Sequence, residues 1–340
     1  MRWNPDRRQI LGAIGSAAIL PRLAQARGRR PLRVMLLGQS LIQRDVCGEG
    51  WPGMKAIAAL LREADVVFTD LETPISGPGA GEPTRADATL HHAPPGVVDC
   101  LKSLGVTLAT TANNHAWDLG TGGILSTIDA LDRRGIVHAG SGRDLAAAAA
   151  PAIQRTSAGG FALVAAAAGA IRPGAAAATD HAGVSELRRR DDGTLEPADT
   201  DRVLAAIRTA RASGATVLMC LHNHYWEPVQ SNTPAWQKAF ARACVDAGAA
   251  AFVGHGTPVM QAREVYRGAP LFHGLGNFIF QTRKADGAYG APAWESVIVD
   301  ATFAEGRFVD ARFHPIRLNP IRRGDFSWGV PEIVRTENGA

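Results

Sequence analysis

Short apolar runs alternate with segments of helical periodicity along most of the chain, and such runs favour buried strands. The predicted strands are Arg33–Leu37, Asp65–Thr69, Val106–Thr110, Phe161–Ala168, Thr216–Leu221 and Ala250–Val253. The predicted helices are Gly53–Glu63, Pro95–Leu104, Gly120–Arg134, Asp201–Ala212 and Trp236–Ala247. This alternation predicts an α/β fold in which helices cover the sheets.

The pattern becomes rich in strands beyond Met260. The predicted strands there are Gln261–Tyr266, Leu271–His273, Ser296–Phe303 and Arg307–Phe313. Arg188–Thr200 is charged and turn-prone, which predicts a surface loop. We see neither an internal repeat nor a Pro/Ser-rich linker, so we predict a single domain over residues 27–340.

The first 26 residues have the layout of an export signal. Arg7 and Arg8 precede the apolar stretch Ile10–Leu20, and Ala24-Gln25-Ala26 offers a small-residue cleavage site. The twin arginines predict the Tat route and a periplasmic or secreted protein. An apolar stretch of about 11 residues is too short to span a bilayer, and no later segment predicts a membrane span. The alternative is a basic N-terminal helix that stays attached.

The positive charge of the chain is concentrated in this predicted signal. Residues 1–26 carry Arg2, Arg7, Arg8 and Arg22 against Asp6, a net charge of +3. The whole chain carries +4, so the remainder carries only +1. A nearly neutral mature part argues against a nucleic-acid partner, because proteins that bind nucleic acids present a strongly basic surface.

The four cysteines, Cys47, Cys100, Cys220 and Cys244, lack the CxxC spacing of a zinc knuckle. An oxidising periplasm permits one or two disulfides among them. The alternative is a set of buried free thiols, which the apolar surroundings of Cys100 and Cys220 fit.

Polar residues collect where four of the predicted strands end. These residues are Asp70 and Glu72, the segment Asn113–Asp118, His222 and His224, and His255. In open α/β sheets sites form at the carboxyl ends of strands, and carboxylate, amide and imidazole groups together suit a divalent metal. Each residue alone also has a structural explanation. Asn114 suits a left-handed turn, Asp118 a helix N-cap, and a single histidine packing in the core.

Five segments in order resemble the CapA (poly-γ-glutamate capsule synthesis) family, whose fold is similar to calcineurin-like metallophosphoesterases. They are DLETPIS from Asp70, TANNHAWDLG from Thr111, LHNHY from Leu221, VGHGTPVMQ from Val253 and LGNFIF from Leu275. The resemblance implies a four-layer αββα sandwich of two mixed sheets around a metal centre. It also implies that Glu72, Asn114, His222 and His255 are metal ligands. His115 would then be a proton donor that Asp118 orients.

Two departures from the family's pattern predict a reduced metal site. Gln39 stands where the family has an anionic aspartate, and Pro258 stands where it has a second histidine. We therefore expect one divalent ion (Mn, Fe or Zn) or none. Asp45 is a candidate to compensate as a catalytic carboxylate, and its alternative is a solvated loop acid.

Several further residues are candidates to contact a substrate. Gln39, His224 and Asn277 are the predicted substrate-binding residues, and His224 is also a candidate third imidazole near the metal. Other candidates are His91 and His92 at a rim and Trp117, Tyr225 and Trp226 for stacking; their alternatives are an exposed loop pair and packing.

Three functions remain open from the sequence. The first is a metal-dependent hydrolase acting on a phosphoester, amide or polymer linkage of the capsule or cell envelope. The second is a metal-independent acid/base enzyme similar to an epimerase or isomerase, which Gln39 and Pro258 favour. The third is a non-catalytic component that binds an anionic polymer or capsule-assembly proteins.

Overall fold

The computed structural model describes residues 29–321 and 327–334. The predicted export signal of residues 1–26 lies outside the described residues. Within them, no helix combines the length and the apolar character that crossing a bilayer requires.

The first sheet is mixed, with strand order β16-β15-β14-β1-β2-β3-β4 and with β13 paired to β1. Its strands are β1 (Leu32–Leu41), β2 (Val66–Leu71), β3 (Leu108–Thr110), β4 (Val137–Ala139), β13 (Asn277–Phe280), β14 (Glu295–Ala304), β15 (Arg307–Leu318) and β16 (Pro331–Ile333). The pairs from β1 to β4 are parallel, as is β13 with β1. The pairs from β1 through β14 and β15 to β16 are antiparallel.

The second sheet has strand order β11-β12-β10-β9-β7-β6. Its strands are β6 (Ala152–Thr156), β7 (Gly159–Ala168), β9 (Thr216–Asn223), β10 (Ala251–His255), β11 (Arg263–Tyr266) and β12 (Ala269–Phe272). The central pairs are parallel and the two outer pairs antiparallel. A separate small sheet joins β5 (Ser141–Gly142) and β8 (Gly183–Val184).

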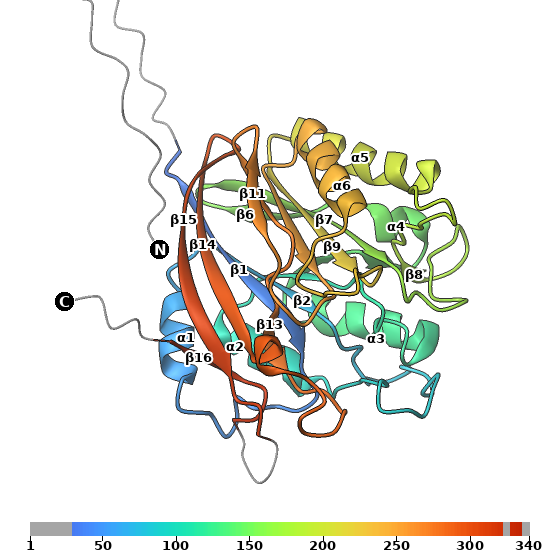
Figure 1. Cartoon of the computed structure of the whole chain (residues 1–340), viewed down its shortest axis with the longest axis vertical. Coiled ribbons are helices and arrows are strands. Elements are labelled where there is room, and N and C mark those ends of the chain that lie inside the picture. Colours follow the sequence, from blue (N-terminus) through green and yellow to red (C-terminus); the bar gives the residue numbers. More distant parts are fainter. Residues whose placement is uncertain (1–28, 322–326, 335–340) are drawn as a thin grey trace, which may run out of the picture.

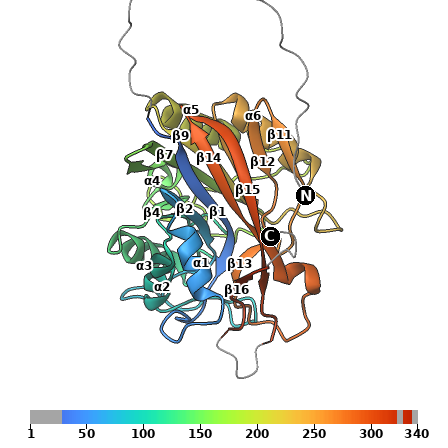
Figure 2. The same cartoon turned by 90° about the vertical axis from the view of Figure 1, so that its left-hand side faces the viewer.

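The helices lie on the outer faces of the two sheets. They are α1 (Met54–Leu61), α2 (Gly96–Leu104), α3 (Gly120–Asp132), α4 (Leu145–Ala149), α5 (Pro197–Ala212) and α6 (Ala235–Asp246), with a 3₁₀ turn at Ala291–Trp294. In Figure 1, α1 and α2 lie at the lower left and α5 and α6 at the upper right, with the strands between them. Figure 2 shows α1 against the face of the first sheet.

Three apolar layers hold this arrangement together. Side chains alternate across β1, so that Met35 and Leu37 pack toward α1 and α2, while Val34 and Leu36 pack toward the second sheet. Val217 and Met219 on the far side of β9 pack toward α5 and α6. Burial on both faces explains why these strands read as continuous apolar runs. The predicted four-layer αββα sandwich of two mixed sheets is confirmed.

The predicted surface loop Arg188–Thr200 is wrong at its C-terminal end, because α5 begins at Pro197. Proline suits the first turn of a helix, where its missing N–H has no partner to lose. Asp199 in that turn is buried and binds the guanidinium groups of Arg188 and Arg202, so the charges of this segment are partly paired inside the fold.

A disulfide joins Cys47 and Cys100, which links the segment after β1 to α2. The alternative of a buried free thiol at Cys100 is therefore wrong. Cys220 and Cys244 are free and buried, and burial raises the pKa of both thiols well above the usual value. They behave as small apolar core residues.

Candidate functional site

The strand ends that carry the predicted ligands meet at one edge of the two packed sheets. Glu72 follows β2 directly, and Asn114 and His115 lie between β3 and α3. His222 is the penultimate residue of β9, and His255 is the last residue of β10. Parallel pairing places His255 beside His222 in the ladder, so both side chains leave the same face.

Four of these side chains and His224 form what we call the donor cluster (Glu72, Asn114, His222, His224 and His255). A Glu72 oxygen lies 3.6 Å from His222 Nε2, and Asn114 Oδ1 lies 2.8 Å from the same nitrogen. One ligand atom each from Glu72, His222 and His224 lie within 4.8 Å of one another. These atoms are of the kinds that divalent metals bind.

Asp70 fixes the orientation of His222 from behind. Its Oδ2 lies 2.7 Å from His222 Nδ1, and its Oδ1 accepts from Asn113 at 3.0 Å. A carboxylate that accepts Nδ1–H leaves a lone pair on Nε2. That lone pair faces the oxygen of Asn114, and a cation between two acceptors satisfies both.

Several buried atoms of the donor cluster have no hydrogen-bond partner among the described residues. They are Glu72 Oε2, His224 Nε2 and both ring nitrogens of His255. Burial, with the charges of Asp70 and Asp118, raises the pKa of Glu72 well above its usual value. Burial lowers the pKa of His255 to about 4 and that of His224 well below its usual value, which favours neutral imidazoles. Buried polar atoms are seldom left unpaired, so Glu72 Oε2 and one nitrogen each of His224 and His255 fit a metal ion.

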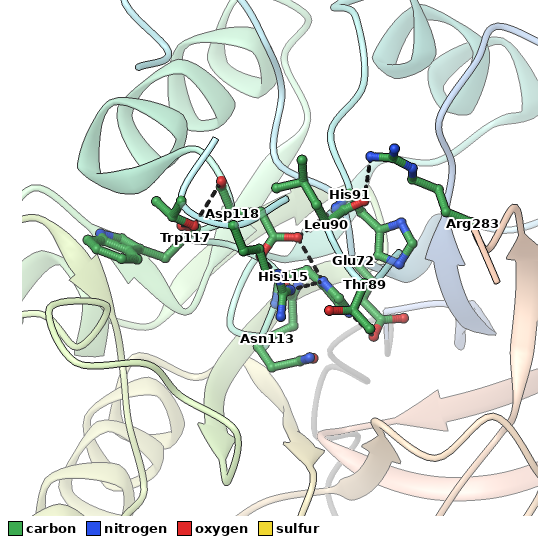
Figure 3. A network of polar contacts seen from close by, with 12 residues as sticks. Glu72, Thr89, Leu90, His91, Asn113, His115, Trp117, Asp118 and Arg283 are labelled. Atoms are coloured by element: carbon green, nitrogen blue, oxygen red, sulfur yellow. Dashed lines mark hydrogen bonds and ion pairs between the residues drawn. The ribbon is translucent and has the colours of Figure 1, made fainter. Parts of the chain in front are cut away.

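His115 belongs to a second group, the dyad network (His115, Asp118, Arg85 and Arg172). His115 Nδ1 lies 2.9 Å from Asp118 Oδ2, while its Nε2 lies 3.9 Å from Glu72 Oε1. The imidazole therefore lies between the two carboxylates, which Figure 3 shows. The predicted contact between Asp118 and His115 is confirmed. The N-cap alternative for Asp118 is wrong, since Leu119 holds that position without a side-chain cap.

Two arginines that the sequence did not single out complete this network. Arg85 and Arg172 reach Asp118 Oδ1 at 2.6 and 2.8 Å. The backbone N–H of His91 donates to Asp118 Oδ2 at 2.7 Å. Asp118 is fully buried and all its contacts are donors, so its negative charge is well compensated. Burial is the main cause that lowers the pKa of His115.

Both groups open onto a cavity of about 290 Å³. Its walls include two of the predicted substrate-binding residues, Gln39 and His224. It is also lined by His91, Arg85, Trp226, Lys284 and Tyr289. His91 therefore lies at the cavity as predicted, whereas His92 is exposed and does not line it.

Two predicted site residues lie elsewhere. The Asp45 carboxylate accepts from the backbone of Cys47 and Gly48, so it caps a turn and is exposed, as its alternative described. Asn277 is fully buried and donates to the carbonyls of Pro258 and Ala293. It fastens two loops together instead of facing the cavity.

The remaining alternatives are decided by local geometry. Asn114 does not adopt a left-handed conformation, which the described chain reserves for Ala170, Arg267 and Glu305 among its non-glycine residues. Of the three aromatic candidates, Trp226 lines the cavity. The ring of Trp117 packs against Arg172, and that of Tyr225 against Trp236.

The sequence reasoning overlooked Arg85 and Arg172 as parts of the site. Asp70 was among the polar residues at the strand ends, but the sequence assigned it no role, and the structure shows that it contacts His222. Arg85 and Arg172 lie in segments without a regular pattern, 33 and 54 residues from Asp118 along the chain, and carry no local signal.

The match to known proteins covers most of the chain. The family model described as "Bacterial capsule synthesis protein PGA_cap" matches residues 33–282. An uncharacterized protein of Sinorhizobium fredii is 29% identical over 73% of this chain and 66% of its own length. The capsule biosynthesis protein CapA of Bacillus anthracis is 28% identical over 68% of this chain and 55% of its own length.

A probable polyglutamine synthesis accessory protein of Mycobacterium tuberculosis is 30% identical over 67% of this chain and 59% of its own length. Among solved structures, the sulfate thiohydrolase SoxB of Thermus thermophilus aligns over 85% of this chain and 57% of its own, with 14% identity and a TM-score of 0.44. The matches thus leave a third or more of each relative's length outside the alignment. On the family match, this chain belongs to the bacterial capsule synthesis protein family PGA_cap.

Proposed function

We propose that this chain is an exported hydrolase that uses one divalent metal ion and cleaves a phosphoester, amide or polymer linkage of the capsule or envelope. One observation carries the proposal. A cluster of metal-type donors with unpaired buried atoms adjoins a histidine–aspartate pair at the same cavity.

The residues present fit a single ion of Mn, Fe or Zn. Glu72, Asn114 and His222 supply a carboxylate, an amide oxygen and an imidazole, and His255 lies beside His222 with both nitrogens unpaired. Gln39 contributes no anion, because its side chain is a neutral amide. Its amide oxygen also accepts from Gly256 N–H. When bound, such an ion supplies Lewis acidity toward the scissile group and toward water.

The protein's own contribution to proton transfer comes from His115. Asp118 accepts Nδ1–H, which fixes the tautomer and leaves Nε2 for a proton exchanged with the substrate. Arg85 and Arg172 keep Asp118 in place and balance its charge. Through Asp118, the network holds the imidazole in one orientation at the cavity.

The cavity walls favour an anionic substrate. Arg85 and Lys284 bring positive charge to the lining, and Trp226 and Tyr289 offer aromatic surface. The relatives from Bacillus and Mycobacterium have names that refer to capsule, PGA or polyglutamine synthesis. We therefore propose an anionic envelope polymer, such as poly-γ-glutamate, or a small fragment of one as substrate. Capsule-assembly proteins are the proposed partners.

Export is a separate part of the proposal. The Tat-type layout around Arg7 and Arg8 supports it, and the disulfide between Cys47 and Cys100 fits an oxidising compartment. The test is a reporter fused to the full chain. The double substitution Arg7→Lys and Arg8→Lys should keep the reporter in the cytoplasm, and unchanged export would overturn this part.

The test of function combines elemental analysis of the purified chain with turnover of a generic phosphodiester and a γ-glutamyl peptide. We expect about one metal ion per chain and turnover that falls strongly in His115→Ala while the metal stays bound. Turnover without metal would instead support the metal-independent acid/base enzyme, which the complete His115–Asp118 pair favours. Absence of both metal and turnover would leave a polymer-binding component.

A further inference from the structure

His224 has the position of a metal ligand. It follows His222 by two residues at the end of β9, and the two rings stack with centroids 5.1 Å apart and an angle of 17° between their planes. In extended chain, residues two apart point to the same side. A ring nitrogen of His224 therefore lies within 4.8 Å of ligand atoms from both His222 and Glu72.

The backbone of His224 is anchored, whereas Nε2 of its imidazole has no polar partner among the described residues. The backbone N–H of His224 donates to Ala168 at 2.7 Å, which continues the β9 pairing. The Trp226 ring lies beside the imidazole with ring centroids 4.5 Å apart, and its Nε1 donates to the carbonyl of Asn223. Nε2 of His224 is buried and unpaired within the described part of the chain. A buried imidazole with an unused nitrogen can accept a ligand.

The side chains of Glu72, His222 and His224 indicate which kind of ion this place would bind. One carboxylate and two imidazoles form a donor set that Zn, Mn and Fe accept. The neighbouring positions Gln39 and Pro258 cannot supply the missing donors, because the amide oxygen of Gln39 is engaged by Gly256 and proline has no side-chain donor. Neither position adds a donor to Glu72 and His222, whereas a nitrogen of His224 is within reach of both.

We propose that His224 is a direct metal ligand, so that Glu72, His222 and His224 together hold the ion beside Asn114, an inference that rests on the proposed metal site. It replaces the predicted substrate-binding role of His224. Trp226 is then a positioning residue that packs against the ligand ring.

The experiment uses the full chain, stripped with a chelator and titrated with Co²⁺. We expect wild type to bind about one ion per chain. His224→Ala should weaken Co²⁺ affinity by at least about 10-fold, the lower range for losing even an outer-shell partner. It should also change the visible absorption of bound Co²⁺, because a ligand is lost. His92→Ala is the matched control, since it removes an exposed histidine away from the cavity.

The outcomes separate this inference from the proposed function. Wild type that binds no Co²⁺ refutes both. Wild type that binds Co²⁺, with unchanged affinity and spectrum in His224→Ala, refutes the His224 assignment and leaves the proposed function standing. If His224→Ala does not fold, His224→Gln keeps the bulk and is read by the same two measurements. A crystal structure of the loaded wild type decides independently, through a His224 nitrogen within about 2.3 Å of the ion or one turned away.

Discussion

The donor cluster and the dyad network share one cavity but differ in how completely their carboxylates are paired. In the dyad network, both oxygens of Asp118 have donors from Arg85, Arg172, His115 and the backbone of His91. In the donor cluster, an oxygen of Glu72 and three imidazole nitrogens are buried without a partner among the described residues.

This difference indicates that the Asp118 carboxylate is satisfied within the fold, whereas the Glu72 carboxylate lacks a donor for one oxygen in the part of the chain that the structure describes. A buried carboxylate surrounded by donors is stable as folded, whereas a buried carboxylate facing unpaired imidazoles is not. The two halves should therefore respond oppositely to substitution. Loss of a donor-cluster residue should mainly cost metal affinity, and loss of a network residue should mainly cost folding stability.

The largest expected effect is on metal affinity in Glu72→Gln. Its carboxylate is the anion nearest His222 Nε2, so the affinity for Co²⁺ should fall by more than about 100-fold, beyond the range for outer-shell partners. Competition with a chromophoric chelator measures it. Glu82→Gln, at an exposed carboxylate, is the control and should bind as wild type does. If Glu72→Gln bound Co²⁺ as tightly as wild type, the proposed difference between the donor cluster and the dyad network would be refuted.

The next effect is on stability in Asp118→Asn. The substitution leaves two partly buried guanidinium groups without their anion, which should cost about 3 kcal/mol of unfolding free energy. Urea unfolding with a chelator present measures it. Asp129→Asn removes an exposed partner of Arg133 and should cost less than about 1 kcal/mol. Metal content should stay at the wild-type level, and its loss would show that the two halves are not separable.

A smaller loss of metal affinity is expected on substitution of Asp70, which contacts His222 of the donor cluster from behind. Asp70→Asn removes the carboxylate that holds His222 Nδ1, so it should weaken Co²⁺ binding by about 10- to 100-fold. The same titration measures it. An unchanged affinity would mean that Asp70 does not orient a metal-bound imidazole.

The smallest effect is the pH dependence of metal-free stability. The raised pKa of Glu72 means that the folded protein keeps this proton above the pH where the unfolded chain releases it. The contribution of Glu72 is therefore fully present below its unfolded pKa of about 4.3 and is lost as pH rises toward the folded value. In chelator, Glu72→Gln should match wild type at low pH and become the more stable protein as pH rises. A difference in thermal stability between Glu72→Gln and wild type that stays constant across pH would contradict this.

Local patterns predicted the α/β class because burial on both faces leaves a mark on each strand by itself, whereas the four-layer arrangement was implied by the resemblance to the CapA family. The apolar runs at Arg33–Leu37 and Thr216–Leu221 lie inside β1 and β9, and the ligand residues follow the strands where expected. The short strands β4, β5 and β8 carried no such mark, since two or three residues show no periodicity.

What the sequence determined by itself is the α/β class, the resemblance to the family, and the residue types at the ends of β2, β9 and β10, because each of these depends on neighbours along the chain. Tertiary structure decided the rest. Arg85 and Arg172 meet Asp118 from distant loops, and Asp45 and Asn277 turn away to cap a turn and to fasten loops. The contacts of Arg85, Arg172 and Asn277 join segments separated in sequence, which only the folded chain brings together, whereas Asp45 accepts from the backbone two and three residues further on.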